Sequence, residues 1–535
     1  RIYKELNPKH CEGCSQGVTS PVQLGREARR RKPPDAQKNE PALVYVENGR
    51  LPHAVDQGEH LLIQKGVQIY QRSTVLVRPA MVEAGNYHGV ERKGTTPIIH
   101  TVDSNYLRDI LTRNATWLKF DARKGEYKPI DCPKAVADTL LSRPGEWRLP
   151  YLRAVIEHPT LRPDGSVLER PGYDADSGLL YIANGSTPSI PSKPTAEDVS
   201  WAIGLLEDLL STFPFVAPED KSVALSAILT ALARRSLPTA PLHAFSSPAP
   251  GTGKTLIVDA CSMIATGKPA AVISQGDSDE ETEKRLHTAL LQGDEVINID
   301  NVDRPVRGDA LCQILTQTVL RVRILGKSQS IDCPSAATVF ATGNNMVLAG
   351  DMARRALLCR LDAECERPEE RSFDRDIYQH VREWRSELIK AGLILLREFQ
   401  QQGCPDQKLK PMGSFEMWST WVRGALVWAG FIDPYKTRTR ILEYDPVLAT
   451  VRNLFNAWHG AFGRLPYTVQ EAIKTSQDDA NLRSAIEAIA STKAGINSRV
   501  FGRWLAKHRD LIVDGLRLIQ APQKQGVSQW KIEEV

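Results

Sequence analysis

A short run of glycine, lysine and threonine has the composition of a phosphate-binding loop. It reads Pro250-Gly251-Thr252-Gly253-Lys254-Thr255. Glycines let backbone N–H groups converge on phosphate oxygens, the lysine ammonium reaches the β- and γ-phosphates, and the threonine hydroxyl can hold Mg²⁺. An apolar run (residues 242–245) precedes it and a helical pattern (residues 256–261) follows. This strand–loop–helix context predicts a nucleoside triphosphate site, with the helix N-terminus favouring the negative charge.

The loop departs from the full pattern at one position. The pattern G-x-x-x-x-G-K-[ST] expects glycine where this chain has Pro248. A chance Gly-Lys-Thr in an ordinary loop is therefore the alternative interpretation.

Two further apolar runs end in residues suited to phosphate chemistry. A buried-strand pattern ends in Asp300 and is followed by Asn301 and Asp303, and a second run, residues 336–342, leads to Asn344. An aspartate at a strand end beside the phosphate loop is the usual second holder of Mg²⁺. A polar amide such as that of Asn344 can orient the attacking water. The three elements in this order predict an ATP-hydrolysing site.

The motifs resemble those of superfamily 3 helicases and of the MCM-like AAA+ helicases of mobile elements. The nearest likeness is to primase-helicase proteins of bacterial prophages and integrated plasmids. The segments that carry it are residues 249–255, 281–286, 299–302, 341–345 and 350–357. The resemblance extends from about residue 50 to the end and is most specific over residues 243–366. It implies an α/β fold with an AAA+ type P-loop core, a hexameric ring, and often a primase domain upstream.

Three arginines follow the third apolar run: Arg354, Arg355 and Arg360. In the resembling ring-shaped ATPases, an arginine at this place enters the neighbouring subunit's site. Such a residue stabilises transition-state charge in trans and requires an oligomer. For each arginine taken singly, an ordinary surface position is the alternative.

Asn301 puts the hydrolytic mechanism in question. Many relatives of this ATPase class have a glutamate after the Mg²⁺ aspartate as the base that activates water, and an amide cannot accept that proton. Asp303, Asp300 or a base from elsewhere in the fold could replace it. A slow or inactive ATPase is the alternative.

Residues 319–332 alternate with a period of two around a Gly326-Lys327 turn, which predicts a β-hairpin. In the resembling rings, a hairpin at this place projects into the central channel. Lys327 at its tip could then grip a backbone phosphate without reading sequence. An exposed turn lysine in a surface hairpin is the alternative.

The C-terminal residues 463–535 have a winged-helix pattern. A helix over residues 479–490 precedes a second helix over residues 497–508, for which Ser498 is the predicted N-cap, and a hairpin follows. Basic residues lie along the second helix: Arg499, Arg503, Lys507 and Arg509. Such a helix can enter the major groove of DNA, although winged helices also mediate protein contacts.

The chain of 535 residues is long enough for several domains. We predict residues 1–41 to be a linker or remnant of an upstream domain, 42–183 an α+β accessory domain, 184–240 a linker and helical lead-in, 241–366 the ATPase core, 367–462 a helical region and 463–535 the winged helix. Thr195 is the predicted N-cap of the first lead-in helix.

Composition indicates a soluble, cytoplasmic protein. Hydrophobic residues make up 41% and charged residues 25%, and no run approaches the ~18 apolar residues of a membrane span. The net charge of +4 is nearly balanced, so nucleic-acid contacts would come from local clusters. No signal-peptide pattern follows Arg1. Cys11 and Cys14 form a C-x-x-C pair, which either is half of a zinc site or has no metal-binding role.

The predicted function is ATP- and Mg²⁺-dependent unwinding of DNA by a hexamer during replication of a mobile element. The hexamer would translocate on single-stranded or forked DNA through its hairpin tips. An ATP-dependent, DNA-binding initiator or loader without processive unwinding is the first alternative. A structural module with an inactive nucleotide site is the second.

Overall fold

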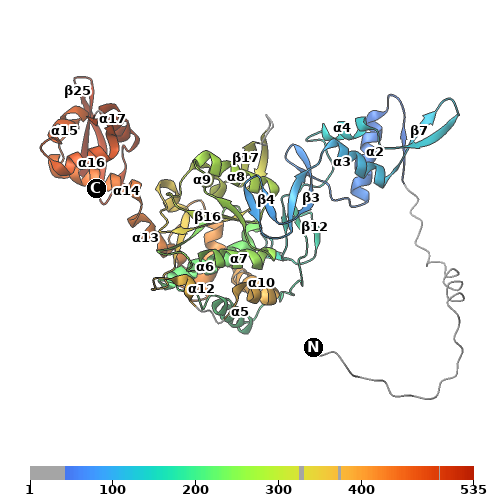
Figure 1. The fold of residues 1–535 in the computed structure, drawn as a ribbon, viewed down its shortest axis with the longest axis horizontal. Helices are drawn as coiled ribbons and strands as arrows, with labels where there is room; N and C mark the ends of the chain where they lie inside the picture. Colours follow the sequence, from blue (N-terminus) through green and yellow to red (C-terminus); the bar gives the residue numbers. More distant parts are fainter. Residues whose placement is uncertain (1–41, 324–329, 372–374, 493–494) are drawn as a thin grey trace, which may run out of the picture. The chain divides into compact units, whose positions relative to one another are not determined.

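The computed structural model describes residues 42–323, 330–371, 375–492 and 495–535. The chain forms two compact units that interleave along the sequence (Figure 1). The described part of the first comprises residues 42–65 and 105–138, and the second comprises residues 66–104 and 139 onward. The accessory domain predicted for residues 42–183 is thus divided between the units. None of the described helices is long and apolar enough to cross a membrane.

The first unit is a three-stranded sheet with helices packed on one face. Its elements are β1 (Leu43–Val46), α2 (Leu51–Gln64), α3 (Ser104–Asn114), β7 (Thr116–Asp121), β8 (Glu126–Ile130) and α4 (Lys134–Leu141). Strand β7 pairs in parallel with β1 and antiparallel with β8, to which a turn after Asp121 joins it. Trp117 anchors the buried face: its ring lies against Gly58 and Leu111, and its Nε1 donates to Leu111 O at 2.9 Å.

A seven-stranded sheet organises the second unit, in the order β20-β14-β19-β16-β15-β5-β4. Its strands are β4 (Gly85–Tyr87), β5 (Val90–Arg92), β14 (Leu242–Ser247), β15 (Ala271–Ser274), β16 (Val296–Val302), β19 (Thr338–Asn344) and β20 (Ala356–Arg360). The pairings among β20, β14, β19, β16 and β15 are all parallel. The protein therefore has a mixed α/β fold with a large, mostly parallel sheet. The carboxyl ends of the parallel strands meet at one edge, where ligands of such sheets bind.

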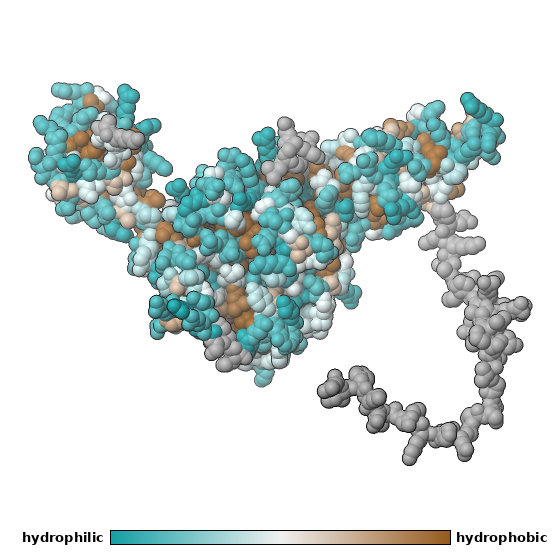
Figure 2. Space-filling model, in the orientation of Figure 1, coloured by the Kyte–Doolittle hydropathy of each residue, from teal (hydrophilic) through white to brown (hydrophobic). Residues whose placement is uncertain are grey.

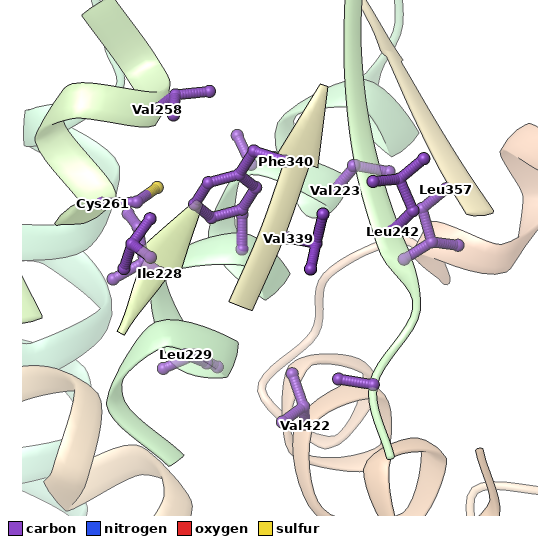
Figure 3. Packing of buried hydrophobic residues seen from close by; sticks show 14 of the residues in the cluster. Val223, Ile228, Leu229, Leu242, Val258, Cys261, Val339, Phe340, Leu357 and Val422 are labelled. Atoms are coloured by element: carbon purple, nitrogen blue, oxygen red, sulfur yellow. The ribbon is translucent and has the colours of Figure 1, made fainter. Parts of the chain in front are cut away.

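Helices cover this sheet on both sides of its apolar strands. They are α5 (Ala196–Leu209), α6 (Pro218–Ala233), α7 (Lys254–Thr266), α8 (Asp279–Gln292), α9 (Asp309–Thr316), α10 (Ile377–Gln401), α11 (Glu416–Trp418), α12 (Gly424–Trp428) and α13 (Arg438–Glu443). Single turns are η1 (Arg234–Ser236), η2 (Gly350–Arg354), η3 (Pro368–Glu370), η4 (Ser419–Arg423) and η5 (Pro434–Thr437). Figure 3 shows Phe340 and Val339 of β19 meeting side chains of α7 and β14 in this core. Polar residues cover most of the face seen in Figure 2.

The predicted N-cap of α5 forms, and a serine caps α8 in a similar way. Thr195 Oγ1 accepts from Asp198 N at 3.2 Å, while the Asp198 carboxylate accepts from Thr195 N at 2.8 Å. Ser278 Oγ accepts from Glu281 N at 3.2 Å at the start of α8. Such caps satisfy N–H groups that lack partners within the helix.

Residues expected in an accessory domain complete the large sheet instead. Glu91 of β5 pairs antiparallel with Val272 of β15. Beside that pairing, Arg92 Nε donates to Asp294 Oδ1 at 2.9 Å, and both side chains are buried. A buried ion pair is costly to break, so this contact holds residues 66–104 against the core that contains the large parallel sheet.

Smaller sheets surround this arrangement in the second unit. One contains β2 (Tyr70–Arg72), β3 (Val75–Val82) and β6 (Thr96–Thr101); another contains β9 (Ala154–Ile156), β12 (Gly172–Asp174) and β13 (Leu179–Tyr181); two hairpins are β10 (Thr160–Leu161) with β11 (Val167–Leu168) and β17 (Val319–Arg323) with β18 (Ser330–Pro334). The predicted hairpin over residues 319–332 is thus confirmed in its strands. Lys327, its predicted tip, lies outside the described residues, as do Cys11 and Cys14.

The C-terminal residues have a hydrophobic core of their own. The elements are α14 (Pro446–Phe462), β21 (Tyr467–Thr468), α15 (Val469–Thr475), α16 (Ala480–Ala490), β22 (Ser491–Thr492), β23 (Gly495–Ile496), α17 (Ser498–Lys507), β24 (Ile512–Val513), β25 (Leu516–Lys524) and β26 (Val527–Glu534). The predicted order of two helices and a hairpin is present. Helix α14 precedes residue 463, yet its Phe455 and Trp458 are fully buried in the same core as Phe501.

The predicted N-cap of α17 is wrong by one residue. Asn497, not Ser498, caps the helix: its Oδ1 accepts from Arg499 N at 3.0 Å and from Val500 N at 3.1 Å. The longer side chain of asparagine reaches both N–H groups from one position earlier, so Ser498 becomes the first helical residue.

Candidate nucleotide-binding site

The predicted phosphate-binding loop joins β14 to α7 at the carboxyl edge of the parallel sheet. Gly251 and Gly253 adopt positive φ angles of 75° and 101°, which other residues adopt only with strain. Gly253 is the N-cap residue, so α7 begins at Lys254. Pro248 is exposed at the start of the loop. The left-handed turns fall at Gly251 and Gly253, so proline with its fixed negative φ is compatible with the loop.

Close contacts exclude a larger residue at Gly251 and disfavour one at Gly253. A Cβ on Gly251 would lie 2.9 Å from the backbone N of Glu369 in η3. A Cβ on Gly253 would lie 3.3 Å from the Phe213 ring. The segment around η3 and the Phe213 side chain therefore pack directly against the loop, a contact that the sequence motifs did not predict.

Lys254 is buried and held by oxygen atoms. Its Nζ donates to Asn344 Oδ1 at 2.8 Å, to Ala249 O at 3.2 Å and to Ser247 Oγ. Burial lowers the pKa of Lys254 below its ordinary value, and the charge of Asp300 opposes this shift. A desolvated ammonium among mostly neutral oxygens is complementary to a polyphosphate, whose negative charge would raise that pKa again.

Thr255 and Asp300 provide a pair of ligands suited to Mg²⁺. Thr255 Oγ1 lies 3.4 Å from Asp300 Oδ1. Adjacent ligands of octahedral Mg²⁺, each about 2.1 Å from the ion, lie about 3 Å apart, so the two oxygens fit such an ion with little movement. Thr342 also donates to Asp300 Oδ1 and orients the carboxylate. Mg²⁺ commonly takes its remaining ligands from phosphate and water.

The strand order explains why these groups meet. Strand β19 lies between β14 and β16, so Asn344 at its end is in register with Ser247 at the end of β14. Hydrogen bonds join Lys254 to Asn344 and Thr255 to Asp300, and the charges of Lys254 and Asp300 link the two pairs into one network. Their roles in binding and hydrolysis stay predictions.

Sequence reasoning missed Ser247 and Thr342, which contact Lys254 and Asp300. Ser247 also accepts from Thr252 Oγ1 at 2.8 Å. Both missed residues carry hydroxyl groups: Thr342 ends the predicted run 336–342, and Ser247 lies two residues beyond the predicted run 242–245, in β14. Their only sequence signal was a polar residue at or just after the carboxyl end of an apolar run.

The structure places Asn301 and Asp303 apart from this network. Asn301 is exposed with φ of 53°, at an irregularity where β16 shifts its register against β19. The Asp303 side chain is 82% exposed, and its carboxylate lies 3.8 Å from Arg304 Nε. Within the described residues, no hydrogen bond links either residue to Lys254 or Asp300. The base that would activate water is not identified by these contacts.

The three candidate arginines lie at opposite ends of β20. Arg355 O accepts from Leu242 N, so Arg355 lies at the amino edge of the sheet, one strand length from the loop. Arg354 and Arg355 both pair with Asp351, the latter at 2.7 Å. Arg360 ends β20 at the carboxyl edge, with its guanidinium 4.7 Å from the centre of the Tyr444 ring. In this chain, Arg355 is too distant to act on its own loop.

The basic residues predicted to bind DNA lie on one face of α17. Arg499, Arg503 and Lys507 recur every four residues and are not buried, whereas Phe501 and Leu505 are fully buried. Among the side chains that the structure describes, none of the three has an ion-pair partner, so their charges are available to phosphates.

The protein is a mixed α/β protein, and its candidate site lies at the carboxyl edge of the parallel sheet, where the chemistry of the residues fits the predicted nucleotide. No protein-family model matches the sequence, and no curated protein matches it. Among solved structures, the chain is similar to the apo NrS-1 C-terminal region, with a TM-score of 0.39 and 12% identity, over 89% of this chain and 98% of that one. It is also similar to SCCmec type IV Cch, an active helicase, with a TM-score of 0.36 and 12% identity, over 88% and 97% of the two chains.

A third likeness is to the JCV helicase, with a TM-score of 0.20 and 13% identity, over 47% of this chain and 74% of that one. Scores and identities this low assign no function. The functional inference rests on the residues of the site.

Proposed function

We propose that this protein is an ATP-driven, ring-forming DNA helicase that acts in the replication of a mobile genetic element. The observation that carries the ATPase part is the contact network of Lys254, Thr255, Asp300 and Asn344 at the carboxyl edge of the sheet. These are the groups needed to hold a triphosphate, a Mg²⁺ ion and an attacking water. The core would then be of AAA+ type, and the C-terminal module a winged helix.

The residues have separable tasks in this proposal. Lys254 would release its neutral oxygen partners and bind the β- and γ-phosphates, while Thr255 and Asp300 would hold Mg²⁺. Asn344 lies beside Lys254, at the γ-phosphate end of the loop, where its amide would orient water. Bound Mg²⁺–ATP supplies the phosphoanhydride bond and a cation that neutralises developing charge.

The arginine positions support assembly into a ring. Arg355 lies a strand length from its own loop, so a role in hydrolysis requires the site of a second copy. A finger in trans stabilises charge that develops on the transferred phosphoryl group. Arg354 and Arg360 are the other candidates for this role.

The nucleic-acid part of the proposal rests on exposed cations. The β17–β18 hairpin presents Arg321 and Arg323 on exposed positions, and α17 presents its basic face. Such charges bind phosphates without reading sequence. The α17 face also supports a second function, a DNA-binding initiator or loader that does not unwind processively.

One series of assays separates these functions. ATP hydrolysis is measured with and without single-stranded DNA, followed by strand displacement on a fork, and particles are imaged with ATP and forked DNA. A helicase gives DNA-stimulated hydrolysis, displacement and rings. Stimulated hydrolysis without displacement identifies an initiator or loader, and absence of hydrolysis contradicts the enzyme assignment altogether.

A further inference from the structure

The sheet of the first unit has one buried face and one exposed face. Side chains alternate along a strand, so Val44 and Trp117 point to the helices and are buried. The register pairs Phe120 with Tyr127 on the opposite face, and Tyr45 with Leu118 on that same side. We call Tyr45, Phe120 and Tyr127 the aromatic face. One ring comes from each of the three strands.

The three rings are exposed, and the Tyr127 ring contacts both of the others. Their relative exposures are 42% for Tyr45, 51% for Phe120 and 44% for Tyr127. The Tyr127 ring centre lies 5.0 Å from that of Tyr45 and 5.4 Å from that of Phe120, at interplanar angles of 78° and 64°. Edge-to-face contacts of this kind restrict the rings before any ligand binds. A ligand would therefore lose less entropy on binding than at three independent rings.

Unpaired cations lie beside this face. The β7–β8 hairpin, residues 116–130, carries four basic and two acidic side chains. Lys128 pairs with Asp121 at 2.6 Å. Across the described ranges, Arg123 and Lys124 in the turn have no ion-pair partner. A surface that binds an apolar protein face does not need such cations. A surface that binds a ligand with alternating rings and negative charges needs both the aromatic rings and the cations.

We propose that the aromatic face binds single-stranded nucleic acid, with bases stacked on its rings and phosphates near Arg123 and Lys124. Base stacking on aromatic side chains tolerates any sequence, and flanking cations follow the backbone. The first unit contains none of the phosphate-loop residues. This site is therefore distinct from the nucleotide site, and its binding does not require hydrolysis.

The site can be located directly by crosslinking. The full-length protein is mixed, without nucleotide, with an oligonucleotide that carries 5-iodouracil, irradiated, and analysed by mass spectrometry. Crosslinks are expected at Tyr45, Phe120 or Tyr127. A crosslink map that contains none of these three residues overturns the proposal.

Substitution then tests whether stacking supplies the binding. The double variant Phe120→Ala/Tyr127→Ala should lose affinity for a thymidine oligomer by about tenfold or more, since each stacked base contributes substantially. Phe120→Tyr/Tyr127→Phe keeps both rings and should retain affinity. Trp384→Ala removes a comparably exposed ring, 45% accessible on α10, and is the matched control.

An abasic oligomer of the same length separates stacking from charge. Wild-type protein should bind it more weakly than thymidine oligomer, and the double variant should bind both alike. A uridine oligomer shows whether the site prefers DNA or RNA. Equal affinity of wild type and double variant for the thymidine oligomer overturns the proposal.

Two other occupants of the face have their own signatures. If a second copy of the chain covers it, the double variant changes the sedimentation coefficient and leaves oligonucleotide affinity unchanged. If residues 1–41 cover it, the full-length protein gives no crosslink at the three rings, and such crosslinks arise only after these residues are removed. Either result overturns the proposal. All of these experiments are done without nucleotide, so their results can be interpreted even if the protein does not hydrolyse ATP.

Discussion

The nucleotide site and the basic face of α17 hold their functional side chains in opposite ways. Lys254 is buried and contacts three oxygen atoms, each from the loop or from an adjacent strand. Arg499 and Arg503 extend from an outer helix face whose order depends only on buried residues behind them. Hydrolysis requires groups fixed to within a fraction of an ångström, whereas phosphate backbones are bound by charge at tolerant distances. Substitutions at the nucleotide site should therefore abolish hydrolysis almost completely, whereas substitutions on α17 should weaken nucleic-acid binding by degrees.

The largest effect is expected for Lys254→Ala. Hydrolysis should fall to background, because the loop loses the cation that contacts the β- and γ-phosphates. Phosphate release from ATP measures it. Lys284→Ala, which removes an exposed lysine paired with Glu280 at 2.9 Å, is the control and should keep wild-type turnover. Near-normal turnover in Lys254→Ala would contradict the assignment of the nucleotide site.

Arg355→Ala should reduce hydrolysis by roughly 10³-fold while nucleotide binding persists, as expected for a finger in trans. Mixing it with Lys254→Ala should restore part of the activity, because each variant keeps what the other lacks. Arg483→Ala, an exposed arginine paired with Glu487, controls for the loss of a surface ion pair. Rings that form from the mixture but show no rescue would exclude Arg355, and Arg354 and Arg360 would be tested next.

Lys327→Ala should abolish unwinding and DNA-stimulated turnover but keep basal hydrolysis and ring formation. The reason is that a single phosphate grip per subunit would be lost from the predicted hairpin tip. Fork displacement and basal hydrolysis are measured on the same preparation. Unwinding at the wild-type rate would contradict the role of the tip.

A graded effect is expected on α17. Replacing Arg499, Arg503 and Lys507 by glutamine should lower the salt dependence of duplex binding, with a slope reduced by about 0.9 per lost phosphate contact. Titrations at several salt concentrations measure it, with basal hydrolysis unchanged. Point variants are preferable to deleting residues 463–535, because that deletion would expose Trp458 and Phe455 of α14. An unchanged slope would assign this face to protein contacts.

The smallest effect is expected on the pH dependence of stability, and it tests the consequence of burying a titratable group in the core. His243 on β14 is fully buried, and burial lowers its pKa to about 3. Between pH 6.5 and 3 the unfolded chain binds a proton that the native histidine does not, so stability is present at neutral pH and is lost on acidification. Lowering the pH from 7.5 to 5 should therefore reduce the free energy of unfolding by about 2 kcal/mol through this histidine. Denaturant unfolding of wild type and His243→Gln at both pH values measures the difference, and parallel pH profiles would contradict it.

The parts of the site that follow from local sequence could be predicted. The glycine-rich loop before a helical pattern singles out Lys254, and the apolar runs that become β16 and β19 single out Asp300 and Asn344, because each ends near a polar residue. The amide cap of α17 was misassigned because Asn497 and Ser498 are both good caps, and only geometry distinguishes them.

Contacts between distant segments could not be predicted in this way. Strand β5 joins the large sheet through one pairing between Glu91 and Val272, which no local pattern encodes. The packing of Glu369 against Gly251 is similarly remote in sequence. The α/β fold class was implied by the resemblance of the motifs, but the division of residues 42–183 between two units depends on such long-range contacts.

That division has a consequence for how the protein folds as it is synthesised. Strand β1 pairs with β7, so the first unit cannot close its sheet until residues 66–104, which belong to the other unit, have left the ribosome. The entropy of closing such a loop grows only slowly with its length. The interleaved order therefore delays the folding of the first unit more than it lowers the equilibrium stability of that unit. Strand β1 must remain unpaired while the ribosome adds the whole intervening segment.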